Sequence, residues 1–188
     1  LMSPIQAFEY MTFANNTFTR LSDLRQPTIA VLNGYALGGG MELALSTDIR
    51  IGYEKTVVGF PEVGLGIIPG FAGTQRMSRL IGTSRTKELI FTARTVKGQE
   101  AYELGILNKL VSVEELLSSA EELAAAMIKN APLALEKAKH VIQVGSELPL
   151  KNAIRLETEA EALLFSTEDK VEGMRAFVEK RKAVFNRK

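Results

Sequence analysis

Three consecutive glycines, Gly38-Gly39-Gly40, separate an apolar run from a helical segment, and they constrain the fold more than any other feature of the chain. The apolar run, residues 28–32, is typical of a buried strand, and residues 41–45 are typical of a helix. Glycine lets backbone N–H groups approach a ligand without interference from a Cβ atom. The first N–H groups of a helix are unpaired and carry partial positive charge. The sequence therefore predicts a strand, a glycine loop and a helix N-terminus that can hold an anion or an oxygen that becomes negative during a reaction.

A second glycine-rich segment covers residues 63–73 and is expected to form a loop. It contains four glycines and Pro69, a composition that disfavours helix and strand. The preceding segment, residues 57–62, is expected to be extended because Pro61 biases Phe60 away from the helical region. We expect the functional contacts of this loop to come from its backbone rather than from its side chains.

Carboxylates are the leading acid/base candidates because the chain has no cysteine and a single histidine. Glu42 follows the glycine triplet on an apolar helix, and Glu62 follows Pro61 among apolar residues. Such settings desolvate a carboxylate partly and raise its pKa. Two such groups facing one pocket could divide the roles of general acid and general base.

Simpler interpretations stay open for each of these features alone. Glu42 could only compensate the charge of a helix N-terminus, and Glu62 could only cap a turn. The glycine triplet lacks the following Lys-Ser/Thr of a phosphate loop and the spacing of a dinucleotide site. Arg76 and Arg79, beside the second loop, could bind an anion or pair at the surface.

The composition is that of a globular protein with an ordinary charge balance. The 188 residues are 46% hydrophobic and 24% charged, with a formal net charge of +1, which favours neither nucleic acid nor a membrane as a partner. Strand and helix patterns alternate over residues 1–130, and residues 131–188 are helical. This order predicts an α/β core followed by a helical C-terminal region, which packs on neighbouring subunits or on its own core.

Local signals predict where individual elements begin and end. Ser3, Pro4 and Gln6 form the pattern of a capping box that opens a helix with Ile5, Phe8, Met11 and Leu21 on its buried face. We expect a strand over residues 48–53 and another over 107–111. Helices are expected over residues 40–46, 74–81, 84–93, 99–104, 112–130, 132–144, 149–165 and 167–182.

Three segments in this order resemble the enoyl-CoA hydratase/isomerase family, the crotonases. Residues 33–44 are similar to its first signature, and residues 60–62 with 65–76 are similar to its second. Residues 172–181 are similar to its C-terminal helix. The resemblance covers essentially the whole chain.

The resemblance implies a crotonase-like spiral of ββα units and hydration of a trans-2-enoyl-CoA to a 3-hydroxyacyl-CoA. It makes Glu42 the base that activates the water and Glu62 the acid that protonates the α-carbon. Substrate-binding backbone is implied at Gly38, Gly39 and Gly70, where Gly39 donates its N–H to the thioester oxygen. Contacts with coenzyme A from a neighbouring subunit are implied at Phe177 and Lys180.

The resemblance further implies no metal and no cofactor beyond the coenzyme A of the substrate. It implies a homotrimer or a dimer of trimers without nucleic-acid or membrane partners, in the bacterial cytoplasm or the mitochondrial matrix. Relatives normally carry, before the position of Leu1, opening strands and an Ala-Gly-Ala-Asp-like segment with a second oxyanion amide, which this sequence lacks. An enoyl-CoA isomerase and a non-catalytic acyl-CoA-binding oligomer are the alternatives.

Overall fold

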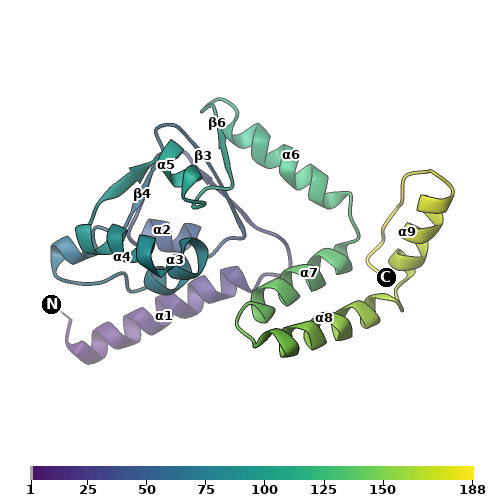
Figure 1. The fold of residues 1–188 in the computed structure, drawn as a ribbon, viewed down its shortest axis with the longest axis horizontal. Coiled ribbons are helices and arrows are strands. Elements are labelled where there is room, and N and C mark those ends of the chain that lie inside the picture. The colour runs from purple at the N-terminus through teal and green to yellow at the C-terminus, as the bar shows by residue number, and fades with distance from the viewer. Residues whose placement is uncertain (1) are drawn as a thin grey trace. The chain divides into compact units, whose positions relative to one another are not determined.

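The structure, a computed structural model, describes residues 2–188, which form two compact units (Figure 1). The first unit holds residues 2–24 and 28–120, in which strands and helices alternate. The second holds residues 25–27 and 121–188, all of whose described regular elements are helical. The predicted α/β class with a helical C-terminal region is confirmed. Helix α6 (Leu116–Ile128) spans the change of unit, and the expected domain boundary after residue 130 stays a prediction.

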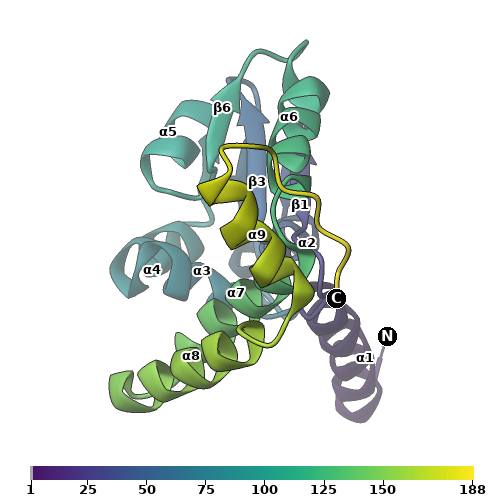
Figure 2. The same cartoon turned by 90° about the vertical axis from the view of Figure 1, so that its right-hand side faces the viewer.

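The strands of the first unit form two small sheets to which the chain contributes in turn. The first sheet has the order β1 (Ile29–Leu32), β3 (Ile49–Tyr53) and β6 (Lys109–Val111), all parallel (Figure 2). The second has the order β2 (Tyr35–Leu37), β4 (Val57–Gly59) and β5 (Thr95–Lys97), with β2 and β4 parallel and β5 antiparallel.

The first two strand pairs explain the spiral. Strands β1 and β3 enter the first sheet, and the strands that follow them, β2 and β4, enter the second. Each two consecutive strands, β1 with β2 and β3 with β4, are followed by helical structure, which completes a ββα unit. Because β2 pairs in parallel with β4, the segments after these two strands emerge at the same edge of the sheet. The two glycine-rich segments therefore meet.

The helices of the first unit enclose a shared apolar core. They are α1 (Pro4–Ser22), α2 (Gly39–Ala44), the 3-10 helix η1 (Glu62–Leu65), α3 (Gly73–Ile81), α4 (Thr83–Thr92) and α5 (Gly98–Glu103). The largest fully buried apolar side chains come from both sheets, from the helices around them and from the segments between: Met41, Ile51, Val58, Phe60, Met77, Leu89, Val96, Ile106 and Leu107. Burial of this apolar surface stabilises the scaffold that carries both glycine loops.

Helix α1 begins as predicted, but its expected buried face is wrong in the first turns. Ser3 and Gln6 form the capping box, with each side chain accepting a hydrogen bond from the other residue's N–H. Ile5 and Phe8 are nevertheless each 73% exposed, whereas Met11 is half-buried. Polar contacts with the rest of the unit come from the middle and the C-terminal end of α1, through Asn15 and Ser22. The apolar spacing predicted the helix correctly but did not predict which part of it contacts the rest of the unit.

Two other boundaries differ from the predictions. Glu62 begins the 3-10 helix η1 instead of ending an extended segment, because the peptide after Pro61 turns and Gly64 N–H donates to Pro61 O over 3.0 Å. Helix α6 begins at Leu116 rather than near Ser112. The Ser112 hydroxyl donates to the Glu115 carboxylate over 2.8 Å, and within residues 2–188 it accepts no hydrogen bond from a helix N–H as a cap would.

The second unit contains α7 (Pro132–Gly145), α8 (Leu150–Leu164) and α9 (Glu168–Val178), of which α7 and α8 pack against each other (Figure 1). Thr167 caps α9 as predicted, by accepting a hydrogen bond from Lys170 N–H. The helix ends at Val178, earlier than expected, and Lys180 has a positive φ of 52° that turns the chain back. No helix within residues 2–188 has the length and apolar character needed to cross a membrane.

Candidate active site

Gly38 occupies the point where β2 ends and α2 begins, and its backbone leaves no room for a side chain. Its φ is +52°, a left-handed conformation that favours glycine. Its N–H donates to Gly59 O over 3.0 Å, which joins the ends of β2 and β4. A Cβ atom at this position would overlap Glu62 Oε1. The glycine therefore brings the first loop into direct contact with the Glu62 carboxylate.

Glu42 lies in the first turn of α2 and is buried, with 1% of its surface exposed. Its Oε1 accepts hydrogen bonds from Phe71 N–H over 2.7 Å and from Gly73 N–H over 2.8 Å. Gly73 begins α3, so the positive end of that helix faces the carboxylate. The backbone of the second glycine loop thus holds one oxygen of Glu42, and its other oxygen is left for a different partner.

Glu62 presents an oxygen with no partner of its own. Its Oε2 is buried and receives no hydrogen bond from residues 2–188. A buried carboxylate oxygen without a donor is costly, and its presence commonly marks a functional group. Since Glu62 touches the Gly38 loop and interacts electrostatically with Glu42, the two carboxylates face one region.

The environment of Glu42 sets its acidity. Burial raises the pKa of Glu42 above its ordinary value, although hydrogen bonds from Gly73 and Phe71 lower it. The neighbouring Glu62 carboxylate raises this pKa further, and the positive charge of Arg76 lowers it. The outcome is a carboxylate that binds a proton more readily than one in water, which suits a group that must accept a proton during a reaction.

Two backbone N–H groups beside the carboxylates remain available to a ligand. Gly39 is the first residue of α2, and within residues 2–188 neither its N–H nor that of Gly70 donates a hydrogen bond. The Phe71 ring lies 3.4 Å from where a Cβ atom of Gly39 would stand, so the first loop is closely packed. The site therefore combines two carboxylates with free amide donors, which can stabilise an oxygen that gains negative charge.

Comparison with known proteins decides the family. The family model described as enoyl-CoA hydratase/isomerase matches residues 3–188. The chain belongs to the enoyl-CoA hydratase/isomerase family. A short-chain-enoyl-CoA hydratase of Clostridium acetobutylicum is 46% identical over 181 residues, which cover 96% of this chain and 69% of that protein.

Other members of this family agree with the assignment. A crotonyl-CoA hydratase of Syntrophomonas wolfei is 41% identical over 184 residues, covering 98% of this chain and 71% of that protein. The crystal structure of an enoyl-CoA hydratase from Bacillus anthracis matches with a TM-score of 0.96 and 40% identity, over 100% of this chain and 72% of that one. The crotonase-like fold expected from the resemblance is confirmed.

Of the residues that the resemblance to the enoyl-CoA hydratase/isomerase family implies, the structure brings five together. Gly38, Gly39 and Glu42 lie at the start of α2, and Glu62 and Gly70 lie in η1 and in the loop after it, in the two segments that follow the paired strands β2 and β4. The N–H of Gly38, unlike that of Gly39, is already bonded to the backbone. Gly38 serves the site through its lack of a side chain, which leaves space for the Glu62 carboxylate. The roles of these residues in catalysis stay predictions.

Phe177 and Lys180, the residues implied to contact coenzyme A, belong to the second unit. Phe177 is 83% exposed at the end of α9, and Lys180 follows in the exposed turn. Their predicted contacts with coenzyme A in a neighbouring subunit stay predictions. Among residues 2–188 there is no group of three or more Asp, Glu or His side chains that could hold a metal ion.

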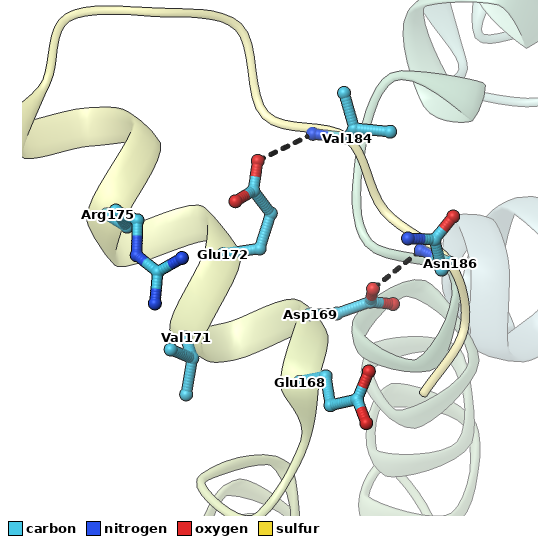
Figure 3. A pocket seen from close by; sticks show the side chains of 7 residues that line it. All are labelled: Glu168, Asp169, Val171, Glu172, Arg175, Val184 and Asn186. Carbon is cyan, nitrogen blue, oxygen red and sulfur yellow. Dashed lines mark hydrogen bonds between the residues drawn. The ribbon is translucent and has the colours of Figure 1, made fainter.

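A hollow of about 460 Å³ lies on the second unit, between α9 and the returning C-terminal segment (Figure 3). Glu172 lines it and accepts hydrogen bonds from the Arg181 guanidinium over 2.6 and 2.8 Å and from Val184 N–H over 3.0 Å. These bonds, with that of Arg181 the largest, lower the pKa of Glu172 to about 2. Asp169 accepts a hydrogen bond from Asn186 N–H over 2.7 Å. Asp169 and Glu172 therefore hold the C-terminal segment against α9.

The sequence did not indicate the polar residues outside the site that hold its backbone in position. Asn15 of α1 donates to Gly70 O over 2.9 Å. Arg76, for which an anion or a surface partner was expected, donates instead to the hydroxyls of Ser22 and Ser46. These contacts join segments far apart in the chain, and no spacing within the sequence indicates them.

Proposed function

We propose that this chain adds water across the double bond of a trans-2-enoyl-CoA to give a 3-hydroxyacyl-CoA. The observation that carries the proposal is the meeting of Glu42 and Glu62, two carboxylates from successive ββα units. One oxygen of Glu42 is bound to two backbone amides, and one buried oxygen of Glu62 has no donor within residues 2–188. The hydratases among the relatives, including one named for crotonyl-CoA, support this reaction.

The proposed mechanism uses each carboxylate once. Glu42 accepts a proton from the water as its oxygen bonds to the β-carbon, and Glu62 donates a proton to the α-carbon. Negative charge develops on the thioester oxygen in between, and the Gly39 N–H donates a hydrogen bond to it. One preorganised donor of this kind is typically worth roughly 3–4 kcal/mol, and a positioned acid or base contributes about a hundred- to ten-thousand-fold.

The proposal includes the binding partners that the family resemblance implies. Coenzyme A enters as part of the substrate, and the residues of the chain supply the remaining chemistry without a further cofactor. Phe177 and Lys180 contact coenzyme A bound to a neighbouring subunit, in a homotrimer or a dimer of trimers. The compartment is the bacterial cytoplasm or the mitochondrial matrix.

The proposed reaction is tested by supplying the protein with crotonyl-CoA and following the loss of absorbance of the conjugated thioester. The product is identified by mass spectrometry in water enriched in oxygen-18. We expect a product that contains one water and carries the label at its hydroxyl group. A trans-3-enoyl-CoA serves as the comparison substrate. Conversion of the comparison substrate to the 2-enoyl isomer, without hydration of crotonyl-CoA, would instead identify an isomerase.

A further inference from the structure

Arg76 connects three helices of the first unit where α2, the helix of Glu42, comes to an end. Its Nη1 donates to Ser46 Oγ over 2.6 Å, and its Nη2 donates to Ser22 Oγ over 3.2 Å. Ser22 is the last residue of α1, Ser46 follows α2, and Arg76 lies on α3 (Figure 1). The Ser22 hydroxyl in turn has two acceptors for its single hydrogen, Ser46 O at 3.1 Å and Phe18 O at 3.2 Å.

Ser46 carries this connection to Glu42. The Ser46 hydroxyl is buried and donates to the main-chain oxygen of Glu42 over 2.9 Å. A hydroxyl has one hydrogen to donate, and because its oxygen accepts from Arg76, that hydrogen is directed at the Glu42 carbonyl. The last carbonyls of a helix lack partners within the helix. Arg76 therefore orients the group that ends α2 and fixes the backbone of Glu42.

The guanidinium also contributes charge. It bonds to neutral hydroxyls, so its positive charge stays available to the Glu42 carboxylate, whose pKa it lowers. The opposing group is Glu62 on η1, whose negative charge raises the pKa of Glu42. Asp23, at the end of α1, faces Arg76 and interacts electrostatically with it. A general base in a buried site must lose its proton before it can act, and a nearby cation favours that form.

We propose that Arg76 is a positioning residue of this hydratase, which holds the end of α2 through Ser46 and places a positive charge behind Glu42 so that Glu42 works as an anion. The inference rests on the proposed function, in which Glu42 is the base. It differs from a purely structural role because it ties one side chain to both the place and the charge of the catalytic carboxylate.

The experiment compares pH profiles of kcat/KM for crotonyl-CoA hydration in the wild type, Arg76→Gln and Arg76→Lys. Loss of the charge in Arg76→Gln should raise the pKa of Glu42, so kcat/KM should fall on the acid side of the profile, where Glu42 becomes protonated. The acid limb should move to higher pH, and the deficit should shrink as the pH rises. Arg76→Lys keeps the charge and should keep the acid limb of the wild type. Arg79→Gln, on the exposed side of the same helix, is the matched control and should leave the profile unchanged.

An acid limb of Arg76→Gln that coincides with that of an active wild type overturns the inference while the proposed function stands. A wild type that does not hydrate crotonyl-CoA contradicts the proposed function, and the inference with it. If Arg76→Gln does not fold, the turnover of the Ser46→Ala variant tests the inference instead. This variant breaks the link to α2 and keeps the charge, so kcat should fall several-fold while the acid limb of the pH profile keeps its wild-type position. An unchanged kcat in Ser46→Ala overturns the inference.

Discussion

Glu42 and Glu172 are both glutamates on helices that accept hydrogen bonds from backbone N–H groups, yet their environments shift their pKa values in opposite directions. Glu42 is buried in the first unit. Its desolvation raises its pKa by more than the hydrogen bonds from two N–H groups lower it. Glu172 lies on the second unit, where Arg181 binds both of its oxygens and lowers its pKa to about 2. The pair with Arg181 keeps Glu172 ionised until the pH approaches 2, whereas Glu42 exchanges a proton more readily.

The difference shows what separates a structural carboxylate from a reactive one in this chain. Both are satisfied by the backbone, so hydrogen bonding alone does not distinguish them. Glu42 has a like charge beside it, and the cation that acts on it, Arg76, is bound to hydroxyls, while Glu172 has its cation in direct contact. Of these two carboxylates, the one that is buried beside a like charge and without a salt-bridge partner is the one proposed to react.

The largest expected effect among the changes around the carboxylates comes from Gly38→Ala. The new Cβ atom would overlap Glu62 Oε1 and would force a left-handed backbone onto alanine. We expect kcat for crotonyl-CoA hydration to fall at least about a hundredfold, which is the usual cost of displacing a catalytic group by about 1 Å. Gly66→Ala is the matched control, because Gly66 has a φ of 78° but open space around its Cβ position.

The Gly66→Ala variant separates backbone strain from displacement of the carboxylate. It should lose about 1–2 kcal/mol of stability from the left-handed conformation and keep most of its activity. Equal losses of activity in both variants would show that strain, rather than contact with Glu62, makes glycine necessary at position 38.

Asn15→Ala tests the support behind Glu42 and should have an intermediate effect. Asn15 donates to Gly70 O, and the N–H of the same peptide unit, that of Phe71, donates to Glu42 Oε1. Removal of the side chain frees this peptide to rotate away from Glu42. We expect hydration to slow by about fivefold, since one hydrogen bond is worth about 1 kcal/mol. Thr17→Ala, on the same helix, should change nothing, and an Asn15→Ala enzyme as fast as the wild type would remove this residue from the account.

The smallest expected effect is on stability, and it should have opposite signs at the two glutamates. The pKa of Glu172 is lowered on folding, so its contribution to stability is present above its ordinary pKa and is lost as the pH falls through about 2. Glu172→Gln should therefore lower Tm slightly at neutral pH, by no more than a few degrees, because the pair is at the surface. The pKa of Glu42 is raised, so Glu42→Gln should melt at or above the wild-type temperature at neutral pH.

Thermal melts of both variants at neutral pH and near pH 3 check this contrast. The difference between Glu172→Gln and the wild type should shrink at the lower pH, where Glu172 begins to lose its charge. Equal destabilisation by both substitutions at neutral pH would contradict the comparison between the two carboxylates.

Sequence patterns predicted the parts of this molecule that depend on neighbours along the chain. The capping box at Ser3, the cap at Thr167 and the strand within residues 28–32 are local features, and the structure has them. Strand β2, which stands between that strand and the glycine triplet, was not predicted. Glu42 and Glu62 could be selected because each adjoins a glycine or proline turn in an apolar context. The meeting of their two segments follows from the parallel pairing of β2 with β4.

The supporting contacts could not be predicted because they join residues that are distant in sequence. Asn15 and Gly70 are 55 positions apart, and Arg76 and Ser22 are 54 apart. Nothing in the local pattern of α1 distinguishes Asn15 from Thr17, or the partnered Met11 from the exposed Phe8. These choices depend on which turns of α1 contact the second glycine loop, and that is a property of tertiary packing.

The central claim is that Glu42 and Glu62 together add water to an enoyl thioester. The most direct measurement is the turnover of crotonyl-CoA by Glu42→Gln and by Glu62→Gln, with Glu88→Gln, an exposed glutamate paired with Arg94, as the matched control. We predict that each of the first two variants loses at least about a hundredfold in kcat and still binds coenzyme A, while Glu88→Gln turns over like the wild type. Turnover near the wild-type rate in either Glu42→Gln or Glu62→Gln would contradict the two-carboxylate site.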